Sequence, residues 1–198
     1  MLPGPETTIE GRPLEISSAS GGEREELLQL GILSAVGEVM PSPCAAPATR
    51  APSVLRRATR VPDVLNEASD YDRPSSFSRA LSFVIADTRV LLISGTASVD
   101  EMGRTVHVGD FRAQCWRTYR NITAILTAEG MDWGDIVRTS CYLRDIERDY
   151  RDFNEVRTTF FEWLGLDPLP ASTGIQARLC REDLLVEIEA MAVSHITR

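Results

Sequence analysis

The alternation of hydrophobic and polar positions predicts five strands and two helices in the C-terminal part of the chain. Runs at 77–85 and 90–99 have strand-like composition and are joined by a short turn at 86–88, which favours a hairpin. Apolar residues with helical spacing follow the cap residue Asp110 as far as Glu129. The remaining predicted elements are a strand at 136–143, a helix at 147–164, and strands at 172–179 and 184–193.

This order, ββαβαββ, predicts an α+β fold in which two helices cover one face of a mixed sheet. The last predicted strand alternates between a fully apolar set and a set that contains two carboxylates. The second set is Leu185, Glu187, Glu189 and Met191. The apolar set suits the helix-covered face. The mixed set therefore predicts either a subunit interface with a polar cleft or a solvent-exposed sheet face.

The N-terminal part of the chain has a different composition. All 13 aromatic residues lie at or after Tyr71, and nine of the 11 prolines lie at or before Pro74. A segment rich in Pro, Ala and Ser without aromatic side chains buries little apolar area. We therefore expect residues 1–60 to be a disordered or loosely attached extension, with a short helix at 23–40, that is inert or docks on a partner. Residues 61–198 are expected to form the folded domain.

Composition and charge exclude several classes of function. The formal net charge of −8 argues against a nucleic-acid partner. The chain contains no lysine, which excludes Schiff-base chemistry and a P-loop. With His107 and His195 as its only histidines, we expect no metal site and no cofactor. The cysteines form no CxxC pair, no signal peptide is visible, and no run of 18 apolar residues occurs, so we expect a cytoplasmic protein without a membrane partner.

Two residues near the C-terminus are candidates for catalysis. Glu187 lies among apolar neighbours, where partial desolvation would raise its pKa toward the range that suits proton transfer through water; Glu189 is its rival. Cys180 lies beside Arg181 and close to Arg178, and neighbouring cations favour a thiolate. Glutamates on strands more often face solvent, and free cysteines more often fill space, so both simpler interpretations stay open.

Two clusters of small residues are candidates for ligand binding. Ser94 and Gly95 lie near the end of the second predicted strand, and Ser172, Thr173 and Gly174 begin the fourth. Small residues let a ligand approach the backbone closely, so N–H groups there could donate to a carboxylate or an oxyanion. Ordinary turns and bulges have the same composition.

Four stretches share their order and spacing with a known superfamily: LLISGTASV, GDFRAQCWRTYRNITAILTAEGMDWGDIVRTSCYLRDI, FNEVRTTFF and PASTGIQARLCREDLLVEIEAMAV. Through them, residues 75–195 resemble the RidA (YjgF) superfamily, once called L-PSP endoribonucleases. The resemblance implies a chorismate-mutase-like fold and a homotrimer with ligand clefts between subunits. It also implies hydrolysis of small reactive enamines and imines to oxo acids and ammonia, without a cofactor.

The resemblance also implies roles for particular residues. Ser94 and Gly95 match a Ser-Gly pair that lines the family's cleft, and Phe77 matches an aromatic residue that stacks over the ligand. Asn154 matches a cleft asparagine, and Glu187 matches the glutamate that positions the hydrolytic water.

Ser172 departs from the family pattern. Deaminase members have arginine at this position, after Pro-Ala, and it binds the substrate carboxylate through two hydrogen bonds. A hydroxyl group cannot replace a guanidinium in that role. A substitute charge would have to come from another residue, and Arg79 and Arg178 are candidates.

A second resemblance leaves the activity open. GTASV, PASTG and the spacing from Cys180 to Glu187 are similar to the C-terminal half of the chorismatases, which hydrolyse or rearrange chorismate. That resemblance implies a cyclic carboxylate substrate and a role for both side chains. The third alternative is a non-catalytic metabolite-binding or protein-interaction module.

Overall fold

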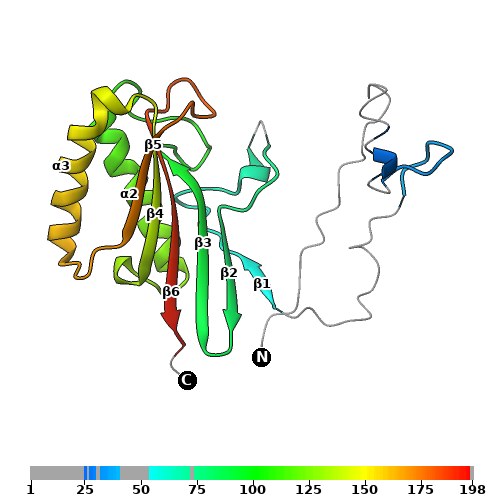
Figure 1. Ribbon diagram of the computed structural model, residues 1–198, viewed down its shortest axis with the longest axis horizontal. Coiled ribbons are helices and arrows are strands. Elements are labelled where there is room, and N and C mark those ends of the chain that lie inside the picture. The colour runs from blue at the N-terminus through cyan, green and yellow to red at the C-terminus, as the bar shows by residue number, and fades with distance from the viewer. Residues whose placement is uncertain (1–24, 26, 30–31, 41–53, 72–73, 197–198) are drawn as a thin grey trace. The chain divides into compact units, whose positions relative to one another are not determined.

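The computed structural model describes residues 25, 27–29, 32–40, 54–71 and 74–196. The chain divides into two compact units, Met1–Pro52 and Ser53–Arg198. Figure 1 labels the main elements of the second unit. In chain order these elements are β1 (Arg56–Ala58), η1 (Ala68–Asp70), β2 (Ala80–Ile85), β3 (Thr88–Ala97), α2 (Phe111–Ala128), η2 (Trp133–Asp135), β4 (Ile136–Leu143), α3 (Ile146–Leu164), β5 (Ala171–Gln176) and β6 (Val186–His195).

A six-stranded mixed sheet with the order β1-β2-β3-β6-β4-β5 organises this unit. Neighbouring strands are antiparallel except β4 and β5, which are parallel. Both α2 and α3 lie on one face of the sheet (Figure 1). This arrangement confirms the predicted α+β fold class. Among the described helices, none has the length and apolar character needed to cross a membrane.

Local sequence signals set the helix ends. The Asp110 side chain accepts a hydrogen bond from the backbone N–H of Ala113 at 3.0 Å, which satisfies a free donor in the first turn of α2. Gly165, with φ of 67°, ends α3 in the left-handed conformation that favours glycine. The predicted bounds of β4 are confirmed, whereas β5 ends at Gln176, three residues before the predicted end at Leu179.

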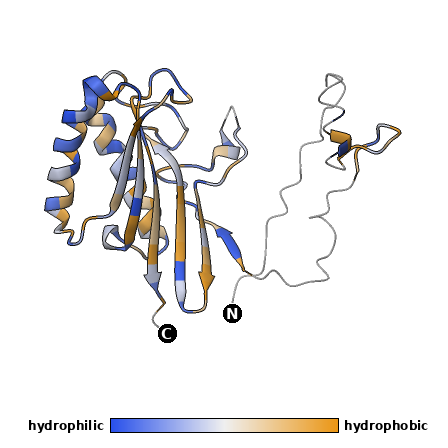
Figure 2. Cartoon of the chain, viewed as in Figure 1, coloured by the Kyte–Doolittle hydropathy of each residue, from blue (hydrophilic) through white to orange (hydrophobic). Residues whose placement is uncertain are grey.

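The hydrophobic core lies between the sheet and the two helices. The apolar set of β6 faces it, since Val186 and Ala192 are 0% exposed. Tyr119 of α2 stacks on Phe160 of α3, with ring centroids 4.7 Å apart. Cys115 is fully buried there, as its place on the apolar side of the helix predicts. Figure 2 shows that α3 alternates hydrophilic and hydrophobic residues, which is typical of a helix with one buried side.

The sequence analysis missed one strand. β1 pairs with β2 and is fixed by Glu129, whose side chain accepts hydrogen bonds from Arg57 and Thr59, each at 2.6 Å. The second unit therefore begins before residue 61, where the domain was expected to start. A three-residue polar strand carries no periodicity, and its partners lie far away in the chain.

The helix expected at 23–40 is not continuous. Residues 27–29 are helical, but Leu33 and Val39 form an antiparallel bridge around Gly37, whose φ is 84°. The rest of the segment expected to be disordered, up to residue 53, lies largely outside the described residues.

Candidate active site

A bulge in β3 creates the centre of the candidate site. The register of β3 and β6 shifts between Ile93 and Thr96, so Ser94 and Gly95 together face a single residue, Glu189. A bulge increases the local twist and changes the direction of nearby side chains. Of the two clusters of small residues predicted from the sequence, the first, Ser94 and Gly95, therefore forms this bulge.

The bulge borders a pocket of about 390 Å³. Most of the site residues predicted from the sequence line it, and they come from β3, β6 and the loops before β2 and β6. They are Phe77, Arg79, Ser94, Gly95, Cys180 and Glu187. Sequence reasoning missed Tyr71 and Ser75, and considered Arg181 only as a neighbour of Cys180. The first two lie before β2, in a stretch without regular periodicity.

Glu187 is a half-buried carboxylate of this pocket, which its rival Glu189 also lines. A Cβ atom added to Gly95 would lie 2.1 Å from Glu187 Oε1, so only glycine leaves room for the carboxylate. Burial raises the pKa of Glu187 above its usual value, the Arg79 charge opposes that shift, and the Glu189 charge adds to it. The site thus contains a carboxylate that takes up a proton more readily than an exposed glutamate.

Arg79 supplies a positive charge beside this carboxylate. Its side chain is held in place: Nε donates to the carbonyl oxygen of Asn66 at 3.1 Å, and Cζ lies 5.0 Å from the ring centroid of Tyr71 and 5.2 Å from that of Phe77. The residue is only 6% exposed. Burial raises the pKa of Tyr71, so its phenol stays protonated at neutral pH. The pocket that contains Glu187 therefore also offers a fixed cation and a phenol hydroxyl.

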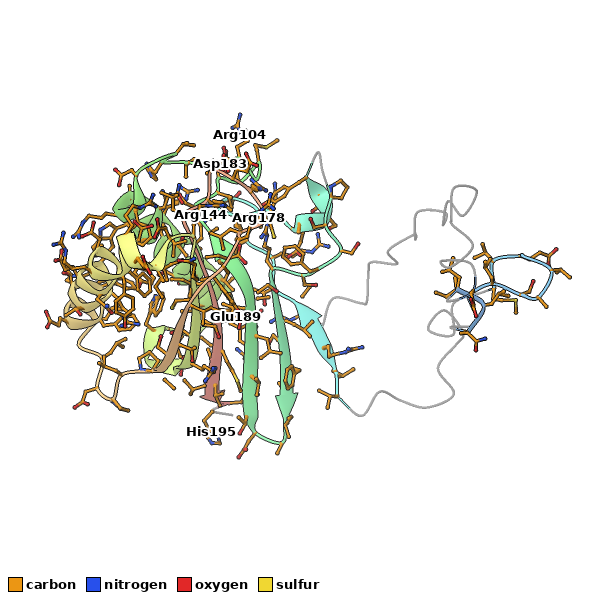
Figure 3. All side chains as sticks on the ribbon, turned by 45° about the horizontal axis from the view of Figure 1, so that its top comes forward. Arg104, Arg144, Arg178, Asp183, Glu189 and His195 are labelled. Atoms are coloured by element: carbon orange, nitrogen blue, oxygen red, sulfur yellow. The ribbon has the colours of Figure 1, made fainter. Side chains whose placement is uncertain are left out.

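Two further residues complete the rim. Cys180 is exposed and lines the pocket, and Arg181 next to it donates to the carbonyl oxygen of Gly103. Arg178, the other candidate for a substitute charge, is exposed and does not line this pocket. In Figure 3 it lies toward the same end of the sheet as Arg144, whereas His195 lies at the other end.

The remaining candidates from the sequence form a separate group. Asn154 lies on α3, and Ser172, Thr173 and Gly174 lie on the exposed strand β5; none of them lines the Glu187 pocket. Sequence reasoning also missed a residue of this group, Arg157, although it follows Asn154 by three positions, the spacing of neighbours on one helix face.

The strand register shows how the two groups are arranged. Ser172 pairs with Thr139, which is buried on the helix side of the sheet. Glu187 pairs with Tyr142, on the face without helices. Within one protomer, Ser172 and Glu187 thus lie on opposite faces of the sheet.

A second cavity, of about 700 Å³, lies between η2 and the C-terminal ends of α2 and α3. It is lined mainly by apolar side chains, including Trp163, and contains none of the predicted site residues. Among the described residues, no three His, Cys, Asp or Glu side chains come together as a possible metal site.

Comparison with known proteins agrees with this fold. Residues 72–194 match the family model described as Endoribonuclease L-PSP. A RutC family protein of Pyrococcus horikoshii is 31% identical over 102 residues, which cover 52% of this chain and 77% of that protein. The 2-iminobutanoate/2-iminopropanoate deaminase of Rattus norvegicus is 28% identical over 120 residues, which cover 61% of this chain and 83% of that protein. The crystal structure of the E. coli YjgF gene product matches with a TM-score of 0.57 at 24% identity. The match covers 70% of this chain and 98% of that protein.

Proposed function

Because the chain belongs to the Endoribonuclease L-PSP family, the RidA/YjgF superfamily, we propose that it hydrolyses small reactive imines or enamines to oxo compounds and ammonia. Relatives with the printed name 2-iminobutanoate/2-iminopropanoate deaminase, about 30% identical, support this class of substrate. The observation that carries the proposal is the half-buried Glu187 carboxylate, with its raised pKa, in a pocket beside Arg79.

In the proposed reaction, Glu187 acts as a general base and then as a general acid. Ionised Glu187 accepts a proton from water while the water oxygen bonds to the carbon of a protonated imine, which gives a neutral carbinolamine. Glu187 returns this proton to nitrogen. The C–N bond then breaks as the hydroxyl proton passes to Glu187, and ammonia leaves and takes up that proton. One water enters, and a ketone and an ammonium ion leave.

The other pocket residues are proposed to bind the substrate. Phe77 is 44% exposed and lines the pocket, and the small residues at the bulge, Ser94 and Gly95, let a ligand approach the backbone. Arg79 places a positive charge in the same pocket, where it limits the rise in the pKa of Glu187. These roles require no metal or other cofactor.

A second copy of the chain is proposed to complete the cleft. Ser172 and Glu187 lie on opposite faces of the sheet, so one substrate could contact both only across two protomers. The face without helices also exposes apolar side chains, such as Leu92 at 42% and Ile85 at 56%. Both observations support the expected homotrimer. Light scattering with size-exclusion chromatography tests it, and a monomer would contradict it.

The activity is tested with imines formed in solution by an amino-acid oxidase. We expect the protein to accelerate ammonia release over buffer, and Glu187→Gln to reduce the rate about 100-fold or more. Glu182→Gln is a matched control, because Glu182 is exposed and does not line the pocket. A wild-type rate equal to that of buffer would contradict the proposal.

Cys180 supports the alternative of chorismatase-like chemistry, because it lines the same pocket as Glu187. In that case the protein would convert chorismate to a hydroxybenzoate or a dihydroxy acid, and Cys180→Ala would change the rate or the product. Absence of turnover with both substrates, together with retained ligand binding, would instead identify a metabolite-binding protein.

A further inference from the structure

Arg157 connects α3 to the exposed edge strand β5. Its Nη1 donates to Ser172 Oγ at 3.2 Å, and its Nη2 donates to Oδ1 of Asn154. Its guanidinium carbon lies 5.1 Å from the ring centroid of Phe153. Two hydrogen bonds and a ring contact thus fix a half-buried guanidinium beside Ser172.

The charge of Arg157 is not neutralised within the described part of the protomer. Its partners there are a hydroxyl and an amide oxygen, and it takes part in no ion pair. The nearby acidic residue Glu155 pairs with Arg112 at 2.9 Å instead. A guanidinium has five N–H donors, and these two contacts leave others for a ligand. Its planar fork matches a carboxylate, so a half-buried and uncompensated arginine is suited to bind one.

The strand beside Arg157 leaves room for such a ligand. Every residue of β5 is exposed, and the Ser172 hydroxyl also accepts a hydrogen bond from Thr139 at 2.9 Å, which orients it. Arginine at position 172, as in the deaminases that this chain resembles, would bring its charge close to Arg157. The small serine avoids that repulsion and leaves one cation at this place.

We propose that Arg157 is the substrate's carboxylate-binding residue and that the cation comes from α3 instead of β5. The substrate is then a 2-imino acid, not a neutral imine. This inference rests on the proposed function. Because the Arg157 group and Glu187 lie on opposite faces of one protomer, a substrate bound by Arg157 could reach only the Glu187 of a neighbouring copy.

Direct binding tests the inference without turnover. We expect 2-oxobutanoate, a 2-oxo acid probe, to bind the full-length protein in calorimetric titrations. Arg157→Gln should weaken binding about 10- to 100-fold, the usual effect of losing a charged hydrogen-bonding pair, and Arg157→Lys should weaken it less. Arg151→Gln is the matched control, because it removes the same charge from an exposed position of α3. The uncharged 2-oxobutanamide should bind Arg157→Gln and wild type equally.

A double variant tests the place of the cation. Arg157→Gln combined with Ser172→Arg places a guanidinium on β5 instead of α3 and should recover at least part of the affinity for 2-oxobutanoate. Thermal unfolding and the oligomeric state of each variant separate a loss of binding from a loss of fold. A double variant that binds as weakly as Arg157→Gln would overturn the placement.

The outcomes distinguish this inference from the proposed function. Equal affinity of Arg157→Gln and wild type for 2-oxobutanoate overturns the inference, even if the protein hydrolyses imines. Arg157-dependent binding without imine hydrolysis supports the inference and contradicts the proposed function. In the hydrolysis assay, Arg157→Gln should raise KM for a 2-imino acid much more than it lowers kcat.

Discussion

The carboxylate of Glu187 packs directly on Gly95, so closely that a Cβ atom at residue 95 would lie 2.1 Å from Oε1 and 2.8 Å from Cδ. The bulge in β3 brings these two residues together, because it inserts Ser94 and Gly95 opposite one position of β6. The position of the proposed catalytic group thus depends on the absence of a side chain on the neighbouring strand.

Gly95→Ala should therefore displace the Glu187 carboxylate while the strands stay paired. We expect kcat for imine hydrolysis to fall about 100-fold, because a shift of about 1 Å is enough to misplace a proton-transfer group. Steady-state kinetics measure this effect, and circular dichroism checks that the fold is retained.

A double variant tests whether the contact with Glu187 is the cause. Gly95→Ala should lower Tm, and Gly95→Ala combined with Glu187→Ala should recover most of that loss, because the clash is gone. Its activity should stay low. If the two substitutions lower Tm additively, the packing of Glu187 on Gly95 is not the source of the effect.

The acid limb of the pH–rate profile should move in opposite directions in two variants. The proposed base must be ionised, so kcat/KM falls as pH drops through the pKa of Glu187. Arg79 lowers this pKa and Glu189 raises it. Arg79→Gln should therefore move the limb to higher pH, and Glu189→Gln should move it to lower pH. Profiles of kcat/KM across the acid range measure both shifts, and identical limbs in all three proteins would exclude Glu187 as the titrating group.

Glu187→Gln should stabilise the protein at neutral pH. Burial raises the folded-state pKa of Glu187 above its usual value of 4.5, which applies to the unfolded chain. At pH values between the unfolded-state pKa and the folded-state pKa, the folded state therefore binds more protons than the unfolded state. Protonated Glu187 thus contributes fully to stability below its unfolded-state pKa, and this contribution is lost as pH rises through its folded-state pKa. At pH 7 the substitution should raise Tm by about 2 °C, as is usual when a strained functional group is removed. The gain should disappear below about pH 4, where the Glu187 side chain of the wild type is protonated and as neutral as the glutamine of the variant. A gain that is independent of pH would contradict this cause.

Glu129→Gln should destabilise the fold far from the candidate site. The Glu129 side chain is fully buried and accepts hydrogen bonds from Arg57 and Thr59, each at 2.6 Å, so it holds β1 against the end of α2. We expect the free energy of unfolding to fall by about 2 kcal/mol in urea titrations, because a buried carboxylate loses its charge-assisted hydrogen bonds. Arg57→Gln should cost less than about 1 kcal/mol, since its side chain is 65% exposed. Equal losses would show that burial of Glu129 does not matter.

Much of the fold follows from local patterns. The cap at Asp110, the stop at Gly165 and the bounds of β4 depend on residues that are neighbours in sequence, so they could be predicted. The alternation in the last strand also predicted which side of β6 enters the core, and Val186 and Ile188 are buried there. The same alternation placed Glu187 on the other face.

Tertiary structure decided the composition of the site. Pairing of β3 with β6 produced the bulge that seats Glu187 on Gly95, and packing of α3 against β5 brought Arg157 to Ser172. Strand register likewise separated Ser172 from Glu187, which the sequence had grouped together. The periodicity of hydrophobic positions indicates only which face of its own helix or strand each side chain lies on. Contacts between elements depend on register and packing across residues far apart in the chain, and no local pattern encodes them.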